Sequence, residues 1–119
     1  MKKARGFTLS ELMIAVLILV IAISALLLTY VTCMLMNESN NNLVTAVNDV
    51  QYVLEEIKSL AYINIYDYEP PQLLHLRGEV IEFDPNPLGA NIIEVTVTAT
   101  WEERNGIQRS FDITTRIHR

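Results

Sequence analysis

An uninterrupted apolar stretch near the N-terminus, from Leu12 to Met36, limits what this chain can fold into more than any other feature. It contains no charged residue, and a helix of about 20 apolar residues is enough to span the hydrocarbon core of a bilayer. Buried core helices more often carry apolar segments of about 10–14 residues. The stretch therefore predicts a membrane-spanning helix. Residues 37–119 remain for a small body that gains from packing on this helix or on neighbouring subunits.

The charges on the two sides of this stretch differ in sign. Basic residues precede it, namely Lys2, Lys3 and Arg5. Acidic residues follow it before the next basic residue, Lys58, namely Glu38, Asp49, Glu55 and Glu56. Because basic residues stay on the cytoplasmic side of a membrane, we expect a cytoplasmic N-terminus and a periplasmic body on a single-pass inner-membrane anchor. The formal net charge of −5 and the lack of a basic patch argue against direct nucleic-acid binding.

A short motif, Gly6-Phe7-Thr8-Leu9-Ser10-Glu11, lies between the basic residues and the apolar stretch. It resembles the class III signal of type IV prepilins and pseudopilins, in which a basic leader ends in glycine and Phe-Thr-Leu-x-Glu follows. The resemblance covers residues 1–36. It implies an α+β fold in which the outer half of a long helix packs on a small antiparallel sheet, the lollipop arrangement of pilins.

The resemblance also implies a role for each residue of the motif. A membrane-bound prepilin peptidase would cut between Gly6 and Phe7, remove the leader with its basic residues, and N-methylate Phe7. Gly6 suits a cut site because it has no side chain. Glu11 would pair with the N-terminal amine of an adjacent subunit, since an unpaired buried charge is costly. The expected partners are this peptidase/methyltransferase, other pilin or pseudopilin subunits, the inner-membrane assembly platform and membrane lipid.

Other interpretations of the N-terminal region stay open. A secretory signal peptide would be cut near Ala22 to Ala25, but its apolar region would be only about 7–15 residues long. A plain membrane anchor has no reason to carry the carboxylate of Glu11, which costs up to about 2.5–3.5 kcal/mol at the bilayer centre and less near the interface. Thr8 and Glu11 also fit a capping box, worth about 1 kcal/mol to the helix start. That role is compatible with pairing between subunits.

The chain turns polar at residues 37–42, where asparagines favour a pause or bend in a helix that otherwise extends from Thr8 to Ala61. Beyond them, apolar residues recur at spacings of four and three, which predicts a stripe that packs on the sheet. This stripe consists of Leu43, Val47, Val50, Leu54, Ile57 and Ala61. Asp49, like most neighbouring polar residues, falls off it.

The apolar stretch contains no proline, and the first proline of the chain is Pro70. Many major pilins carry a helix-breaking proline there, so minor pilins and pseudopilins are the closer match.

The region after the helix is expected to be irregular over residues 62–75, with tyrosines that pack over the domain edge or, alternatively, form a binding surface. A strand is predicted from Arg77 to Phe83, and a loop from Asp84 to Gly89. Within this loop only Asp84 and Asn86 offer side-chain oxygens. Calcium takes about 6–8 oxygen ligands, so no metal site is predicted.

Two alternating segments near the C-terminus predict a β-hairpin. In the first, the apolar residues are Ile93, Val95, Val97, Ala99 and Trp101. In the second, the residues expected to be buried are Ile107, Phe111, Ile113 and Ile117. A two-residue turn at Asn105-Gly106 would place these two sets on opposite faces of the sheet. The sequence therefore predicts a three-residue loop, 104–106, with Gly106 left-handed in a bulge.

This register has consequences for individual pairs. It sets Ala99 opposite Phe111, Val97 opposite Ile113, and Trp101 opposite Arg109, the last as a cation–π contact. The hairpin also resembles the closing hairpin of small minor pseudopilins and minor pilins, in which a Val-x-Val-x-x-x-Trp strand precedes a glycine turn.

We find no catalytic constellation in the sequence. The histidines, His75 and His118, are far apart in the chain, and no Ser/His/Asp set, CxxC pair or phosphate-binding loop occurs. The lone Cys33 is expected to be a small apolar side chain, with an intersubunit disulfide or lipidation as alternatives. We expect no enzyme activity, no cofactor and no metal.

The expected organisation is a leader over 1–6, a transmembrane and filament-core helix over 7–36, an amphipathic helical continuation over 37–62, and a small antiparallel sheet domain over 63–119. The expected function is that of a minor pilin or pseudopilin subunit of a type IV pilus, type II secretion or DNA-uptake machine. It would copolymerise into a filament through its N-terminal helix. The alternative is a signal-anchored periplasmic module that binds a ligand or partner and does not assemble.

Overall fold

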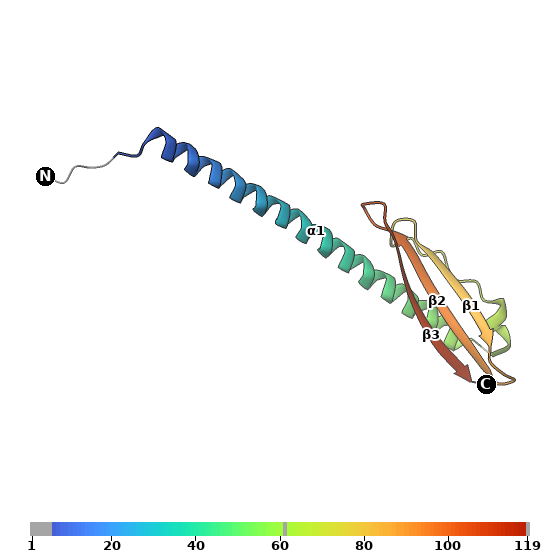
Figure 1. Ribbon diagram of the computed structural model, residues 1–119. Coiled ribbons are helices and arrows are strands. Elements are labelled where there is room, and N and C mark those ends of the chain that lie inside the picture. The colour runs from blue at the N-terminus through green and yellow to red at the C-terminus, as the bar shows by residue number, and fades with distance from the viewer. Residues whose placement is uncertain (1–5, 61, 119) are drawn as a thin grey trace. The chain divides into compact units, whose positions relative to one another are not determined.

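The computed structural model describes residues 6–60 and 62–118. The described elements are an α-helix α1 (Leu9–Ser59), a 3₁₀ helix η1 (Tyr62–Asp67), and the strands β1 (Val80–Pro87), β2 (Ile92–Glu102) and β3 (Gln108–His118) (Figure 1). The chain divides into two compact units, Met1–Glu38 and Ser39–Arg119. An α+β architecture of one long N-terminal helix and a three-stranded antiparallel sheet is therefore confirmed.

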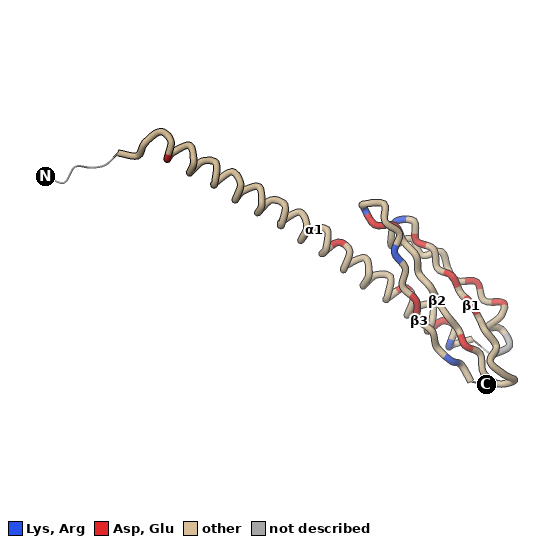
Figure 2. The backbone as a smooth tube through the Cα atoms, viewed as in Figure 1, with Lys and Arg blue, Asp and Glu red and all other residues tan. Residues whose placement is uncertain are grey.

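The first unit contains the N-terminal part of α1, and its side chains are apolar around the whole circumference. Residues 6–37 are all exposed, and the most apolar 18-residue window of α1 has a mean hydropathy of 3.1. Glu11 is the only charged residue among residues 6–37, and most of this part of α1 is tan in Figure 2. A helix that is apolar on every side needs an apolar environment on every side. By length and composition α1 is able to cross a membrane.

Polar side chains within this apolar part bond to their own helix. The hydroxyls of Ser24, Thr29 and Thr32 donate to the carbonyl oxygens four residues earlier, at 2.8, 3.0 and 2.9 Å. An unsatisfied hydroxyl would be costly in lipid, and these bonds satisfy it without a neighbour.

The predicted pause at residues 37–42 is wrong, because α1 continues through them as α-helix. Asparagine disfavours a helix interior by less than about 0.7 kcal/mol relative to alanine, which flanking turns on both sides readily offset. The helix ends at Ser59, close to its predicted end; Ala61 lies outside the described residues.

In the second unit, one face of α1 packs against β2 to form the core. The core consists of Ala46, Val50, Val53, Leu54 and Ile57 from α1, Ile65 from η1, Leu76 from the following loop, and Ile93, Val95, Val97, Ala99 and Trp101 from β2. The odd-numbered residues of β2 are buried and the even-numbered ones are only partly buried, as the alternation predicted.

The predicted stripe on α1 is correct at Val50, Leu54 and Ile57 and wrong at its N-terminal end. Leu43 is exposed and Val47 only half-buried, whereas Ala46 and Val53 are fully buried. The buried face is centred on positions 46, 50, 53 and 57, so it is rotated relative to the predicted stripe. Alanine at position 46 lets the helix backbone approach the sheet more closely than a larger side chain would.

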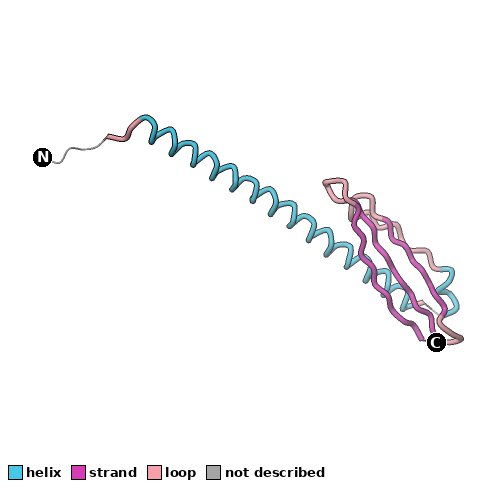
Figure 3. Tube along the Cα trace, viewed as in Figure 1, coloured by secondary structure: helices cyan, strands magenta, loops and turns pink. Residues whose placement is uncertain are grey.

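The strands form one sheet in the order β1-β2-β3, with both pairs antiparallel (Figure 3). Leu88, directly after β1, donates its N–H to the carbonyl oxygen of Ile92 at 3.1 Å. Because successive residues of a strand point their backbone N–H and C=O groups to opposite sides, the even-numbered residues of β1 also direct theirs towards β2. The nitrogens of Pro85 and Pro87, which cannot donate, therefore face the open edge. An edge strand tolerates proline there.

The predicted bounds of the first strand are wrong by three to four residues. Arg77 and Gly78 belong to a turn before the strand, and β1 runs on through Asp84 to Pro87, where a loop was expected. The residues Phe83 and Pro85 pair with Val97 and Val95, so the alternation of half-buried residues continues past Asp84. Packing against β2 overrides the local preference of these residues for a turn.

The predicted register of the hairpin is confirmed: Ala99 pairs with Phe111, Val97 with Ile113 and Trp101 with Arg109. The loop has three residues, closed by the bond from Glu103 N–H to the Ile107 carbonyl oxygen at 2.9 Å, and Gly106 has a φ of +79°. Ile107 is half-exposed, so its predicted burial is wrong; it lies in the bulge and no longer follows the alternation. The cation–π contact of Trp101 stays a prediction, and the Arg109 guanidinium lies 3.4 Å from Glu103.

The segment after α1 is more regular than predicted, because η1 occupies residues 62–67. Tyr68 follows it and packs over the edge of the core, with its ring edge-on to Phe83 at a centroid distance of 5.5 Å. Its hydroxyl donates to Oε2 of Glu56 at 2.7 Å. Tyr66 is half-exposed.

Candidate functional site

The predicted processing site lies just ahead of α1. Gly6, Phe7 and Thr8 are outside any helix or strand, and the side chain of Phe7 is 86% exposed. A Cβ atom added at Gly6 would meet no other atom within 4 Å. Among the described residues, the fold therefore places no steric demand for glycine at position 6. The predicted leader charges Lys2, Lys3 and Arg5 lie outside the described residues.

The predicted capping box is formed by Thr8 and Glu11. The Thr8 N–H donates to Glu11 Oε2 at 2.9 Å, and the Glu11 N–H donates to Thr8 Oγ1 at 3.4 Å. The Thr8 hydroxyl also donates to the same Oε2 at 2.9 Å. These contacts satisfy backbone groups that the first turn leaves without partners, and the helix dipole favours a carboxylate there.

The processing residues and the predicted assembly residue lie together. Gly6, Phe7, Thr8 and Glu11 line one open hollow at the start of α1. The bonds to Thr8 engage Oε2 of Glu11, so the carboxylate presents its other oxygen for a further donor. An ammonium group is a suitable donor, because charge-assisted hydrogen bonds are the stronger ones.

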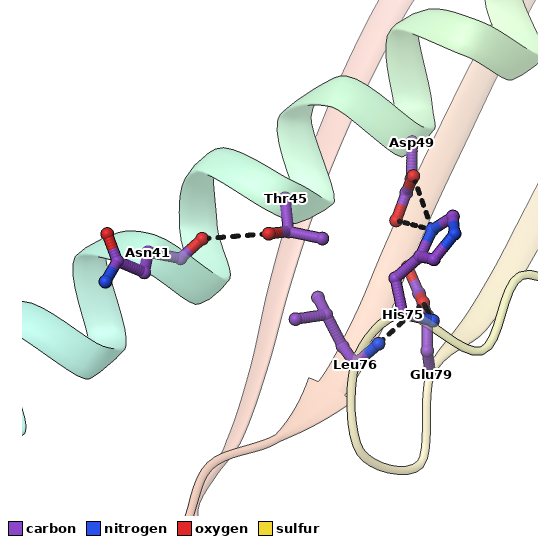
Figure 4. A network of polar contacts seen from close by, with 6 residues as sticks. All are labelled: Asn41, Thr45, Asp49, His75, Leu76 and Glu79. Carbon is purple, nitrogen blue, oxygen red and sulfur yellow. Dashed lines mark hydrogen bonds and ion pairs between the residues drawn. The ribbon is translucent and has the colours of Figure 1, made fainter.

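Sequence reasoning missed a second group of polar residues, which lies in the other unit (Figure 4). Asp49 comes from α1, and His75 and Glu79 come from the loop between η1 and β1. Oδ1 and Oδ2 of Asp49 lie 3.0 and 3.1 Å from Nδ1 of His75. One ligand atom from each of the three residues lies within 4.8 Å of the others. We refer to these three residues as the Asp49 cluster.

A tight turn brings the two loop residues of the Asp49 cluster together. Gly78 has a φ of +61°, which favours glycine, and the Glu79 N–H donates to the Leu76 carbonyl oxygen at 3.3 Å. Glu79 Oε2 then accepts the N–H groups of His75 and Leu76, both at 3.1 Å. Burial, and after it the adjacent carboxylate of Asp49, raise the pKa of Glu79, while these N–H groups oppose the rise.

The signal that could have revealed the cluster is weak in the sequence. Asp49 lies beside Val50 and three residues after Ala46, so it belongs to the buried face of α1 once that face is placed correctly. His75 and Glu79 lie on either side of the turn that contains Gly78. This turn brings two residues four positions apart into contact without a helix. Neither feature stands out before the packing is known.

The prokaryotic N-terminal methylation motif matches residues 1–27 of the chain. No curated protein and no solved structure shows significant similarity to the chain. The motif implies processing by a prepilin peptidase and assembly with other pilins, and together with the apolar helix it indicates a membrane-anchored protein. The N-terminal methylation motif over residues 1–27 therefore indicates a precursor of the type IV pilin-like kind.

Proposed function

We propose that the chain is a minor pilin or pseudopilin subunit that copolymerises through its N-terminal helix into a filament of the type IV pilus kind. The observation that carries this proposal is the exposure of every residue from Leu9 to Asn37 on a helix that is apolar around its circumference. Such a surface fits lipid before assembly and a bundle of equivalent helices after it. The work of the subunit is structural, and we propose no enzymatic activity for it.

The precursor would be inserted with Lys2, Lys3 and Arg5 in the cytoplasm and the sheet domain in the periplasm. Cleavage between Gly6 and Phe7 removes these basic residues, which hold the N-terminus at the membrane surface. The scissile bond precedes the helix, so a peptidase meets it in an open, non-helical segment. Methylation of the new amine of Phe7 completes maturation.

Glu11 would then guide docking. Its carboxylate is the only charge between Arg5 and Glu38, and it lies in the first turn of α1. In an apolar environment an unpaired charge is expensive, and the amine of Phe7 on an adjacent subunit offsets it. This pair favours one axial register of neighbouring helices over all others.

The first experiment is the intact mass and N-terminal sequence of the protein from membranes of cells with and without a prepilin peptidase. We expect a chain that begins with methylated Phe7 only when the peptidase is present. An N-terminus that stays at Met1, or a cut between Ala22 and Ala25, would contradict the proposal and favour the anchored or secreted binding module.

A second measurement tests assembly separately from processing. Surface filaments are sheared from cells, and the share of the protein in the sheared fraction is compared with the share left in membranes. A processed chain that never leaves the membrane fraction would support the anchored module and rule out copolymerisation.

A further inference from the structure

Glu79 has a carboxylate oxygen for which the fold supplies no hydrogen-bond donor. Oε2 accepts the N–H groups of His75 and Leu76, whereas Oε1 is buried and has no donor among the described residues. The residue as a whole is only 7% exposed. A buried acceptor without a donor is destabilising, and native proteins rarely keep one without a reason.

A second carboxylate beside Glu79 increases this cost. Asp49 is also 7% exposed, and it lies close enough to Glu79 to contribute to the raised pKa of that residue. Two carboxylates at close range repel each other unless a cation or a shared proton lies between them. His75 contacts Asp49, but the bonds made by its side chain do not reach Glu79 Oε1. A cation that contacts all three residues would satisfy the oxygen and offset the repulsion.

The donor set fits one class of cation. An imidazole nitrogen and two carboxylates suit zinc and similar transition metals, whereas calcium and magnesium prefer oxygen ligands alone. Ligands on tetrahedral zinc at about 2.0–2.2 Å are about 3.3–3.6 Å apart. The contact of His75 Nδ1 with Asp49 Oδ1, at 3.0 Å, needs to open only slightly to admit the ion.

We propose that Asp49, His75 and Glu79 bind a Zn²⁺ ion, with water as the fourth ligand, and that the ion joins α1 to the loop ahead of β1. The His75 side chain is 59% exposed, so solvent and metal reach the cluster from its side. The N–H groups of His75 and Leu76 hold Oε2 of Glu79, which orients Oε1 for the ion. This proposal does not depend on filament assembly.

The test is zinc binding by the full-length chain in detergent, purified without a polyhistidine tag and stripped with a chelator. Zn²⁺ is titrated in competition with a chromogenic chelator. We expect one equivalent to bind to the wild type and to His118→Ala, the control that removes the chain's other histidine. Affinity should fall at least about tenfold in His75→Ala and in Asp49→Asn.

The state of the fold is checked in each variant by far-ultraviolet circular dichroism and by the emission of Trp101, the chain's only tryptophan. His75→Ala is the decisive variant, because its half-exposed side chain can be removed without opening the core. Co²⁺ gives a second readout: its visible bands should appear with the wild type and be lost in His75→Ala. The proposal is overturned if the wild type binds no stoichiometric zinc, if His75→Ala binds it equally well, or if Ca²⁺ competes at equal concentration.

Discussion

The hydroxyl of Ser39 donates a hydrogen bond of 2.5 Å to Oε1 of Glu103, which is 64 residues away in the sequence. The same oxygen lies 3.4 Å from Nε of Arg109, and Glu103 is only 7% exposed. This contact joins α1 to the turn between β2 and β3. Because the acceptor is a buried carboxylate, the hydrogen bond is worth more than a surface one.

We therefore expect Ser39→Ala to lower the free energy of unfolding by about 1–3 kcal/mol. The matched control is Ser59→Ala, whose exposed hydroxyl donates only to a carbonyl oxygen of its own helix. Its effect should stay within about 0.5 kcal/mol. Urea unfolding of the full chain in detergent, followed by Trp101 emission, gives both values. Equal effects of the two substitutions would show that the Glu103 contact does not stabilise the fold.

Substitutions at Glu11 separate its capping of α1 from the role in assembly that we propose for it. Glutamine can still bond to the Thr8 N–H in a capping box, but it carries no charge. We expect Glu11→Gln to be cleaved normally and yet to reach the sheared filament fraction at least about tenfold less than the wild type, because the charge pair is lost. Thr8→Ala removes the cap and keeps the charge, so it should assemble far better than Glu11→Gln. The reverse order would mean that Glu11 acts through helix capping alone.

Glu79→Gln should stabilise the metal-free chain. The amide oxygen of glutamine can still accept the N–H groups of His75 and Leu76, while its NH₂ group replaces the oxygen that has no donor and faces the second carboxylate. We expect a gain of about 1 kcal/mol in the free energy of unfolding with chelator present.

With zinc at about 100 times its Kd, the free energy of unfolding of the wild type should rise by about 2.7 kcal/mol. The wild type should then be more stable than Glu79→Gln. Thermal unfolding of both proteins in chelator and in zinc measures this reversal. If the wild type is the more stable protein in chelator as well, the unpaired oxygen carries no cost.

The contact between Tyr68 and Glu56 predicts a loss of stability at high pH. Burial, together with the Glu56 carboxylate, raises the pKa of Tyr68 above its ordinary value of about 10. A group whose pKa is higher in the folded state than in the unfolded state contributes its full stabilisation below the unfolded-state pKa. This contribution is lost as the pH rises from the unfolded-state pKa through the folded-state pKa. The free energy of unfolding should therefore fall from about pH 10 upwards.

Tyr68→Phe tests this directly. The variant should be about 1 kcal/mol less stable than the wild type near pH 8, because it lacks the bond to Glu56, and the two curves should converge above about pH 10. Tyr66→Phe, at a half-exposed position, is the control and should follow the wild-type curve. Parallel curves for Tyr68→Phe and the wild type would contradict the raised pKa.

The left-handed conformation of Gly106 gives a further prediction. Its φ of +79° is strained for any residue with a Cβ atom, so Gly106→Ala should destabilise the fold by roughly 1–2 kcal/mol. Gly89→Ala is the control, since a Cβ atom there meets nothing within 4 Å and its φ is not positive. Denaturant unfolding of the two variants should differ by at least about 1 kcal/mol, and equal values would contradict the role of Gly106 in the bulge.

The features that could be predicted from the sequence are those that depend on the spacing of residues along the chain. The hairpin register followed from the parity of Trp101 and Phe111, because a slip of one residue turns every side chain to the other face. The Thr8 and Glu11 capping box followed from a spacing of three. Both are set by residues close in sequence or by a strict alternation.

The features that could not be predicted depend on how separate elements meet. Which face of α1 is buried was decided by the contact of Ala46 and Val53 with the sheet, so Asp49 was misplaced. The extension of β1 to Pro87 depends on pairing with β2, which local turn preferences do not reveal. The Asp49 cluster combines residues from a helix and a loop, 26 residues apart in the case of Asp49 and His75, and no spacing rule covers such a combination.

The capping box has one more consequence, for the relation between precursor and product. Both of its residues, Thr8 and Glu11, lie on the C-terminal side of the proposed cut after Gly6, and so does the bond from the Leu12 N–H to the Thr8 carbonyl oxygen. A cut there would remove the positive charges of Lys2, Lys3 and Arg5 and leave both residues of the capping box in the product. Under the proposed function, the peptidase would therefore release a subunit whose first helical turn is already formed.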